Sequence, residues 1–119
     1  MNVEPVKVRP KKGPEAIIQT AICKKLRQMG WVVMETHGNL YSFGLPDVYA
    51  THFDVGGRWI EVKNPLKYSF TPAQLKFFPM LSANGTPIWI LTSDEDEEIK
   101  KLFRPQNWHH YLKGAFDVR

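Results

Sequence analysis

Two carboxylates and a lysine have residue types and a spacing that suit a divalent cation. Asp47 opens a predicted strand, and Glu61 and Lys63 end the next one along the chain. Side chains alternate along a strand, so Glu61 and Lys63 leave the same face of it. Mg²⁺ takes oxygen ligands, typically one or two carboxylates together with phosphate oxygens, and a lysine beside it can stabilise charge on a phosphate. The three residues predict a metal-assisted site, unless Glu61 and Lys63 are only an exposed strand pair and Asp47 only a turn cap.

The predicted strands 47–53 and 58–63 must pair to bring these residues together. The intervening residues 54–57, Asp-Val-Gly-Gly, predict a tight turn and hence a β-hairpin. In the register that this turn suggests, Asp47 lies beside position 64, within reach of the other two side chains.

The rest of the hydrophobic pattern predicts an α/β domain. The predicted elements are helix 14–29, strands 31–37, 47–53 and 58–63, helix 71–85, strand 87–92 and helix 94–103. This order, α-β-β-β-α-β-α, predicts a mixed β-sheet flanked by helices. Strand 87–92 is wholly apolar, as in strands buried on both faces of a sheet. Pro79 is expected to kink the second helix or end it early, and Ser93 or Asp94 is expected to cap the acidic helix.

Length and composition limit the chain to one compact domain. We expect a basic N-terminal arm over residues 1–13 and a single domain over residues 14–119. One cysteine excludes an intrachain disulfide. The apolar runs are far shorter than a membrane span, and the N-terminus lacks the apolar segment of a secretory signal. These features predict a cytoplasmic protein that has no membrane partner.

The distribution of charge points to a polyanionic partner. Five of the twelve acidic residues form the run 94–98, so the rest of the chain carries sixteen basic residues against seven acidic ones. Lysine and arginine near phosphates release condensed counterions, which favours binding to nucleic acid. A merely basic, soluble surface explains the same surplus.

The GLPD segment 44–47, followed by IEVK at 60–63, resembles the PD-(D/E)xK nuclease core. The wider pattern is similar to the VRR-NUC branch of that superfamily, and it spans about residues 14–92. Its four parts are a glutamate in the first helix, a G-x-P-D strand, an E-V-K strand and a glutamine early in the next helix. In this chain they are Glu15, Gly44 to Asp47, Glu61 to Lys63, and Gln74.

The resemblance implies a restriction-endonuclease-like fold and Mg²⁺- or Mn²⁺-dependent hydrolysis of phosphodiester bonds, with no further small-molecule cofactor. Stand-alone VRR-NUC proteins, often encoded by phages and bacteria, are similar to Holliday-junction resolvases in acting as dimers. The resemblance therefore implies an endonuclease that cuts DNA, including four-way or otherwise branched DNA, as a homodimer. It also implies a bacterial cell or a phage-infected host as the setting.

The resemblance also implies a role for each residue of the core. Asp47 and Glu61 would bind the metal directly, and the Val62 carbonyl would complete the protein's share of the ligands. Lys63 would position or activate the attacking water.

Two further catalytic candidates, Glu15 and Gln74, have structural explanations as well. Glu15 could bind the metal through water, or it could simply be a favourable charge in the first turn of a helix. Gln74 could hydrogen-bond to Lys63 or to the attacking water, whereas its position three residues after Thr71 also fits a capping box.

Aromatic and basic side chains flank the predicted site and could contact an unpaired nucleotide or the backbone phosphates. They are Tyr41, Phe43, Lys67, Tyr68 and Phe70, with Lys11 and Lys12 from the N-terminal arm. Core packing explains each aromatic side chain equally well. Two other classes of function stay open: a non-catalytic DNA-binding module with a nuclease-like fold, and an RNA-directed nuclease.

Overall fold

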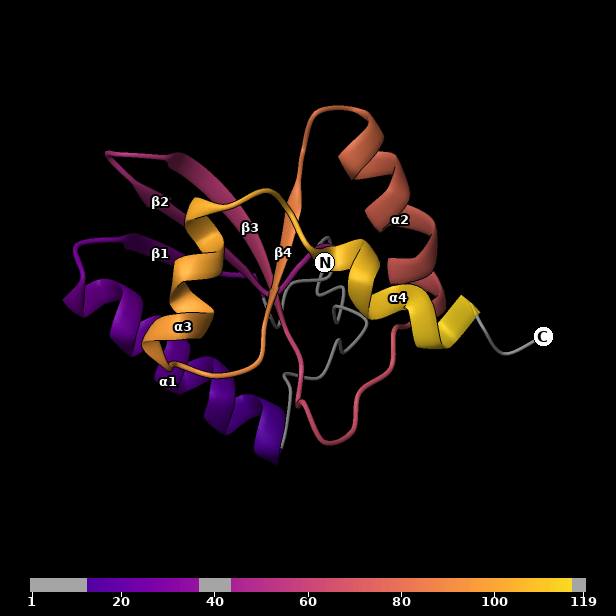
Figure 1. The fold of residues 1–119 in the computed structure, drawn as a ribbon, viewed down its shortest axis with the longest axis horizontal. Coiled ribbons are helices and arrows are strands. Elements are labelled where there is room, and N and C mark those ends of the chain that lie inside the picture. The colour runs from indigo at the N-terminus through magenta and orange to yellow at the C-terminus, as the bar shows by residue number, and fades with distance from the viewer. Residues whose placement is uncertain (1–12, 37–43, 117–119) are drawn as a thin grey trace, which may run out of the picture.

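The computed structural model describes residues 13–36 and 44–116 as a four-stranded sheet between two layers of helices (Figure 1). The elements are α1 (Pro14–Gln28), β1 (Val32–Glu35), β2 (Val48–His52), β3 (Gly56–Val62), α2 (Pro72–Ala83), β4 (Ile88–Leu91), α3 (Asp96–Ile99), the 3-10 helix η1 (Lys100–Phe103) and α4 (Trp108–Phe116). The strand order is β1-β2-β3-β4, with the first two pairings antiparallel and β3 parallel to β4. The predicted mixed sheet of the α/β class is confirmed, and α4 is an additional helix.

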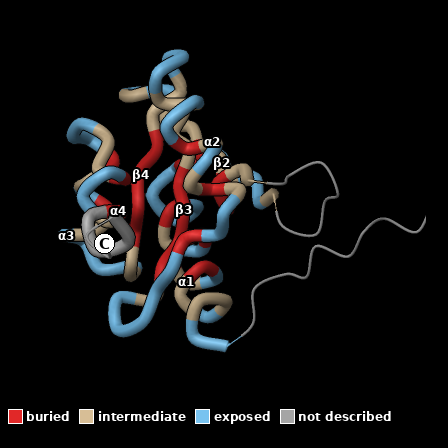
Figure 2. The backbone as a smooth tube through the Cα atoms, turned by 90° about the vertical axis from the view of Figure 1, so that its right-hand side faces the viewer, coloured by how far each residue is buried: buried red, intermediate tan, exposed pale blue. Residues whose placement is uncertain are grey.

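Each face of the sheet is apolar and is covered by its own helices. On one face Ile22 and Leu26 of α1 pack with Val48 and Ile60, in a cluster that also includes residues of α3 and η1. On the other face Phe78 of α2 belongs to a second cluster, with residues of β4 and α4. Burial is concentrated along β3 and β4 in the middle of the molecule (Figure 2). The two central strands are thus the rigid frame on which side chains at their ends are positioned.

β4 is buried along its whole length although it is an edge strand of the described sheet. The side chain of Gln106 accepts a hydrogen bond from the Ile88 N–H at 3.0 Å. Asn107 accepts from the Ile90 N–H at 2.6 Å and donates to the Ile90 carbonyl at 3.1 Å. Side chains therefore satisfy backbone groups that a buried edge would leave unpaired. The predicted burial of this strand is confirmed.

The hairpin turn lies earlier than the sequence predicts. Residues 53–55 form the turn, and the Val55 N–H donates to the His52 carbonyl at 3.2 Å. Gly56, with φ of 77°, then starts β3 in a conformation that glycine adopts without strain. The predicted turn over 54–57 is wrong because this first glycine belongs to the strand.

Pro79 does not end α2, which continues to Ala83. Pro79 itself faces solvent, whereas Phe78 before it is fully buried, and Leu81 after it packs against the same apolar cluster. Packing of the apolar face thus outweighs the lost backbone hydrogen bond.

The acidic segment is not the single helix that the sequence predicts over 94–103. It forms the short α3 and then η1, and the N-cap is Glu95 rather than Ser93 or Asp94. Ser93 instead accepts a hydrogen bond from the Glu95 N–H at 3.2 Å, one residue before the helix begins.

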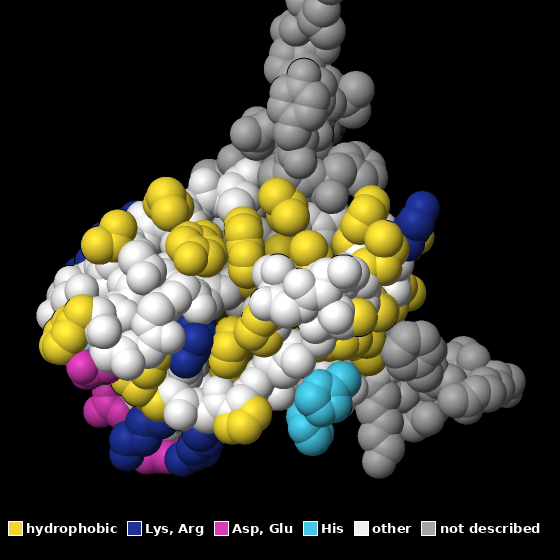
Figure 3. Space-filling model, turned by 90° about the horizontal axis from the view of Figure 1, so that it is seen from above, with side chains coloured by type: hydrophobic (Ala, Val, Ile, Leu, Met, Phe, Trp, Pro, Cys, Tyr) yellow, Lys and Arg dark blue, Asp and Glu magenta, His cyan; other side chains and the backbone are white. Residues whose placement is uncertain are grey.

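Exposed apolar side chains are scattered over the surface rather than confined to one element. The view in Figure 3 shows them over much of that face, with Lys, Arg, Asp and Glu mainly towards its edges. No helix among the described residues is long and apolar enough to cross a membrane.

Candidate active site

Asp47, directly before β2, lies opposite Glu61 of β3. Val48 pairs with Ile60, so the next position along the ladder places Asp47 against Glu61 rather than beside position 64. The Asp47 N–H donates to Glu61 Oε1 at 3.2 Å, and the Val62 N–H donates to Asp47 Oδ2 at 2.8 Å. The predicted register is wrong because the turn closes earlier. The two residues nevertheless meet, because each carboxylate accepts a hydrogen bond from the backbone of the other segment.

Lys63 and Glu61 form a buried ion pair at the end of β3. Lys63 Nζ lies 3.0 Å from Glu61 Oε2, and the two side chains are 4% and 0% exposed. The same ammonium donates to the Ser69 carbonyl at 2.8 Å and to Gln74 Oε1 at 3.2 Å. An ammonium has three donors, and here they have three acceptors. The structure therefore excludes the exposed strand pair that the sequence alone left open.

Gln74 combines the two roles that the sequence left as alternatives. Its backbone N–H donates to Thr71 Oγ1 and its Oε1 accepts from the Thr71 N–H, both at 3.1 Å, so the capping box is present. Its Oε1 also accepts from Lys63, and its Nε2 donates to Glu61 Oε2 at 2.8 Å. One side chain thus joins the start of α2 to the buried ion pair.

Glu15 reaches the same end of the sheet from the first turn of α1. Its Oε2 accepts a hydrogen bond from the Asn64 N–H, directly after Lys63, at a long 3.5 Å. In Figure 1 the start of α1 lies near the loop that follows β3. Glu15 is therefore at the rim of the site, bound to the backbone that follows the lysine.

The loop before Asp47 is held at two points. Thr36 Oγ1 donates to the Pro46 carbonyl at 2.6 Å, and the Thr36 N–H donates to the Asp47 carbonyl at 2.9 Å. Gly44, with φ of 77°, sits so close to α2 that an added Cβ would lie 2.6 Å from a Phe77 ring carbon. The glycine of the G-x-P-D motif is thus required both by its backbone conformation and by this close approach.

Sequence reasoning did not assign Ser69 and Phe70 to the lysine. The Phe70 ring centroid lies 4.5 Å from Lys63 Nζ, and the ring is only 9% exposed. Phe70 therefore packs inside and does not present its face to a nucleotide. The only signal in the sequence was its place in the loop between the E-V-K strand and the next helix.

The remaining predicted nucleic-acid contacts lie further out. Lys67 is exposed, and Tyr68 is 39% exposed with its hydroxyl donating to the Tyr111 carbonyl at 3.2 Å. Lys11, Lys12, Tyr41 and Phe43 lie outside the described residues.

Cys23 lies under the sheet and has no chemistry to offer the site. It is a free thiol that is 1% exposed. Burial, helped by the nearby Glu35 carboxylate, raises its pKa to about 12. A neutral, buried thiol is neither a nucleophile nor a metal ligand at neutral pH.

The residues present fit a small, hard divalent cation. Within the described residues, no group of three or more His, Cys, Asp and Glu side chains is gathered closely enough to hold a metal, so Glu15 does not complete a three-carboxylate cluster. Asp47 and Glu61 remain as a pair of adjacent carboxylates. Mg²⁺ and Mn²⁺ prefer oxygen donors, and Mg²⁺ is commonly held by one or two carboxylates while phosphate oxygens and waters complete its shell.

One solved structure resembles this arrangement as a whole. A chain described as a "VRR_NUC domain" superposes on this one with a TM-score of 0.63 and 17% sequence identity, over 78% of this chain and 98% of that one. This chain has the VRR-NUC fold. No protein-family model and no curated protein matches the sequence.

The VRR-NUC fold accounts for the element order. The resemblance noted in the sequence is confirmed at the level of the fold, which is nuclease-like. The four parts of the motif meet at one end of this fold: Glu15, the loop from Gly44 to Asp47, the segment from Glu61 to Lys63, and Gln74.

Proposed function

We propose that this chain is a Mg²⁺- or Mn²⁺-dependent nuclease that hydrolyses phosphodiester bonds in DNA. The observation that carries the proposal is the reciprocal hydrogen bonding between the Asp47 segment before β2 and the end of β3, with Lys63 Nζ 3.0 Å from Glu61 Oε2. A buried carboxylate pair with an adjacent ammonium is costly to maintain for stability alone. Its position at the end of a nuclease-like sheet supports a catalytic use.

Different side chains of the site would bind the metal ion and position the groups around it. Asp47, Glu61 and the Val62 carbonyl would hold the metal ion, which when bound supplies a Lewis acid that neutralises charge on the cleaved phosphate. Gln74 and Lys63 hold Glu61 Oε2 at 2.8 and 3.0 Å, and so fix the direction in which that carboxylate points. Lys63 supplies the positive charge of this cluster, which would stabilise charge on the phosphate, and it would position or activate the attacking water once substrate binding frees one of its three donors.

The proposal is tested with an isosteric change at Asp47. Asp47→Asn keeps an oxygen that can accept from the Val62 N–H but removes the charge, and Asp54→Asn makes the same change in the exposed hairpin turn. Nicking of supercoiled plasmid with Mg²⁺ or Mn²⁺ should fall at least about a hundredfold in Asp47→Asn, which corresponds to roughly 2.7 kcal/mol. It should be unchanged in Asp54→Asn.

The same assay separates the other classes of function. Equal activity of both variants would contradict a catalytic role for this site. A wild-type protein that binds DNA without cutting it would be a non-catalytic binding module. Faster cutting of RNA than of DNA of matched sequence would make it an RNA-directed nuclease.

We further propose that the substrate is branched DNA and that the active form is a homodimer. One chain offers one pair of metal-binding carboxylates, whereas symmetric cutting of a four-way junction needs two sites related by a two-fold axis. Cleavage of a four-way junction should exceed that of linear duplex, and sedimentation should give a dimer. A monomer at micromolar concentration that still cuts junctions would refute the dimer.

A further inference from the structure

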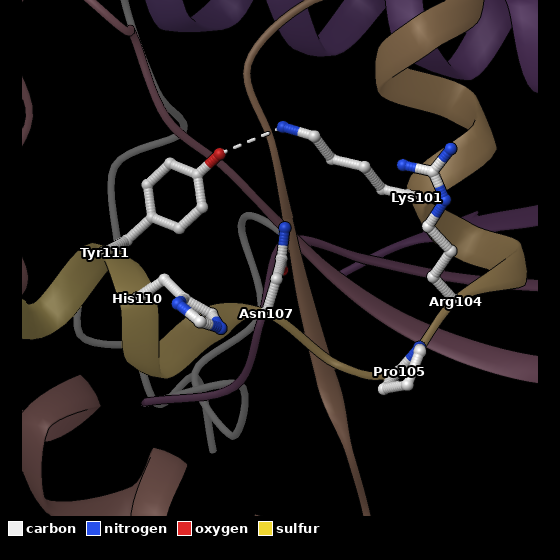
Figure 4. Close-up of a pocket in the computed structure, with 6 residues that line it drawn as sticks. All are labelled: Lys101, Arg104, Pro105, Asn107, His110 and Tyr111. Atoms are coloured by element: carbon white, nitrogen blue, oxygen red, sulfur yellow. Dashed lines mark hydrogen bonds between the residues drawn. The ribbon is translucent and has the colours of Figure 1, made fainter.

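A cavity outside the carboxylate site lies at the edge of β4, between η1 and α4. Its volume is about 290 Å³, near the lower end of the ~300–1,000 Å³ range of small-molecule sites. The residues that line it are Lys101, Arg104, Pro105, Asn107, His110 and Tyr111 (Figure 4). None of them belongs to the carboxylate site, and three of them carry nitrogen donors on long or aromatic side chains.

The backbone around this cavity is fixed. The Trp89 indole N–H donates to the Arg104 carbonyl at 2.9 Å. Asn107 is held by both backbone groups of Ile90. A ligand would therefore meet a preformed floor, and little ordering of the chain would oppose binding.

The charge of the cavity is positive. Lys101 stretches from η1 towards α4, where its Nζ donates to the Tyr111 hydroxyl at 3.2 Å (Figure 4). The same ammonium pairs with Glu98 of α3. Burial alone would lower the pKa of Lys101, but Glu98 and Tyr111 outweigh it and hold the pKa above its usual value. Within the described residues the Arg104 guanidinium has no ion pair, so its charge is not balanced.

A row of contacts joins this cavity to the catalytic lysine. The Lys63 ammonium lies over Phe70, whose ring centroid is 6.0 Å from that of Tyr68. Tyr68 in turn lies 5.9 Å from Tyr111, and the Lys101 ammonium is 5.8 Å from the Tyr111 centroid. The loop after β3 thus contacts α4 between the two cationic groups, and Tyr68 is the exposed residue on this path, above the buried Phe70.

We propose that this cavity binds a phosphate group of the substrate DNA strand, away from the bond that is cut. The proposal rests on the proposed function, because it takes the strand to run from Lys63 across Tyr68 and Tyr111. Arg104 and Lys101 supply charge-assisted hydrogen bonds to the phosphate oxygens, and His110 adds a donor from the opposite wall. Tyr68, which is exposed, lies between the phosphate that is cut and the phosphate in the cavity, and its ring can stack on an unpaired base.

Replacing single phosphates tests this assignment. We would measure the affinity of a labelled single-stranded oligonucleotide by fluorescence anisotropy in EDTA, so that no cleavage occurs. A neutral methylphosphonate is placed at each position in turn. In the wild type the methylphosphonate should weaken binding about tenfold at one position, as expected for the loss of one charge-assisted hydrogen-bonded contact.

Arg104→Ala supplies the decisive comparison. It should weaken binding of the unmodified strand about tenfold and reduce the slope of log K against log salt by about 0.7, the value for one phosphate of a single strand. The methylphosphonate at the sensitive position should then cause no further loss, whereas other positions behave as in the wild type. Lys24→Ala, which removes an exposed charge from α1, is the matched control and should leave the sensitive position unchanged.

Other outcomes overturn the proposal. If no single position responds to Arg104→Ala, the cavity does not hold a phosphate of the strand. If inorganic phosphate shifts the NMR signals of His110 and Arg104 while the DNA pattern stays unaltered, the cavity takes a free anion instead. If Asp47→Asn loses cleavage but no methylphosphonate position responds to Arg104→Ala, the proposed nuclease function stands and the proposed phosphate site is rejected. If one methylphosphonate position does respond to Arg104→Ala but the wild-type protein cuts no DNA, the phosphate site stands and the nuclease function is rejected.

Discussion

The Asp47 N–H donates to the Glu61 carboxylate at 3.2 Å, while the Val62 N–H, the next along from Glu61, donates to Asp47 Oδ2 at 2.8 Å. Each strand therefore orients the carboxylate of the other. Because a shift of one residue would turn the side chains to the opposite face, the register of the hairpin decides whether the site exists. The chemistry of the proposed nuclease thus depends on the same backbone pairing that closes the sheet.

The close approach of Gly44 to α2 predicts an effect on both stability and cleavage. In Gly44→Ala the new Cβ would lie 2.6 Å from Phe77 and 3.3 Å from the Ala73 carbonyl oxygen. We expect the unfavourable φ to cost about 1–2 kcal/mol of unfolding free energy, and crowding against α2 to add about 1–3 kcal/mol. Plasmid nicking should fall as well, because Asp47 lies three residues further on.

Gly85→Ala is the control for the backbone contribution. Gly85 has φ of 88°, and an added Cβ would meet nothing within 4 Å. Urea unfolding should give only the backbone cost, with cleavage retained. Equal losses of stability in the two variants would mean that the approach of the loop to α2 has no energetic consequence.

The buried ion pair predicts a large loss of stability when only one partner is removed. Lys63→Met leaves the fully buried Glu61 carboxylate without its counter-charge, which should cost about 3–5 kcal/mol. Adding Glu61→Gln should restore part of this loss, since the unpaired charge is then gone. Lys67→Met, at an exposed position in the following loop, should change stability by less than about 0.5 kcal/mol.

This result would also decide how activity data are read. A Lys63 variant that loses cleavage can have lost its fold, whereas the isosteric Asp47 variant isolates the chemistry. Urea curves of Lys63→Met that coincide with those of the wild type would contradict the buried pair.

Glu98 predicts a stability difference that depends on pH. Burial would raise the pKa of this carboxyl, but hydrogen bonds from Lys101 and Thr92 outweigh it and hold the pKa below its ordinary value of 4.5. A lowered folded-state pKa means that the carboxylate stabilises the protein above pH 4.5. That contribution is lost as the pH falls through the folded-state value.

Glu98→Gln should therefore be less stable than the wild type by about 1 kcal/mol at pH 7. The difference should shrink as the pH is lowered below 4.5, as followed by urea unfolding across the acid range. Glu97→Gln is the control, because Glu97 is exposed and its pair with Lys100 contributes little. A Glu98→Gln deficit that stays constant down to acid pH would rule out the ionised carboxylate as its cause.

Much of the fold could be predicted from local patterns. Patterns of a few residues predict three of the elements: the apolar spacing of α1, the Thr71–Gln74 capping box of α2 and the apolar run of β4. The failures came where tertiary packing decides. Gly56 could equally end a turn or start a strand, and the anchoring of Phe78 carries α2 through Pro79.

The site was predictable in its members but not in its contacts. Residue types and order brought Asp47, Glu61, Lys63 and Gln74 together, because the motif is conspicuous even in a sequence that no family model matches. The Ser69 carbonyl and the ring of Phe70 at the lysine could not be predicted, since they depend on the path of an irregular loop. The cavity at β4 was missed because η1 and α4 meet only in the folded chain.

The most direct test is where a paramagnetic ion binds. In ¹H–¹⁵N spectra, substoichiometric Mn²⁺ should broaden the amide signals of Asp47, Glu61 and Val62 first, and Asp47→Asn should abolish this broadening. Signals of the acidic run 94–98 should persist under the same conditions. Broadening confined to that run, with residues 47 and 61–62 unaffected, would contradict a shared metal site between the two strands.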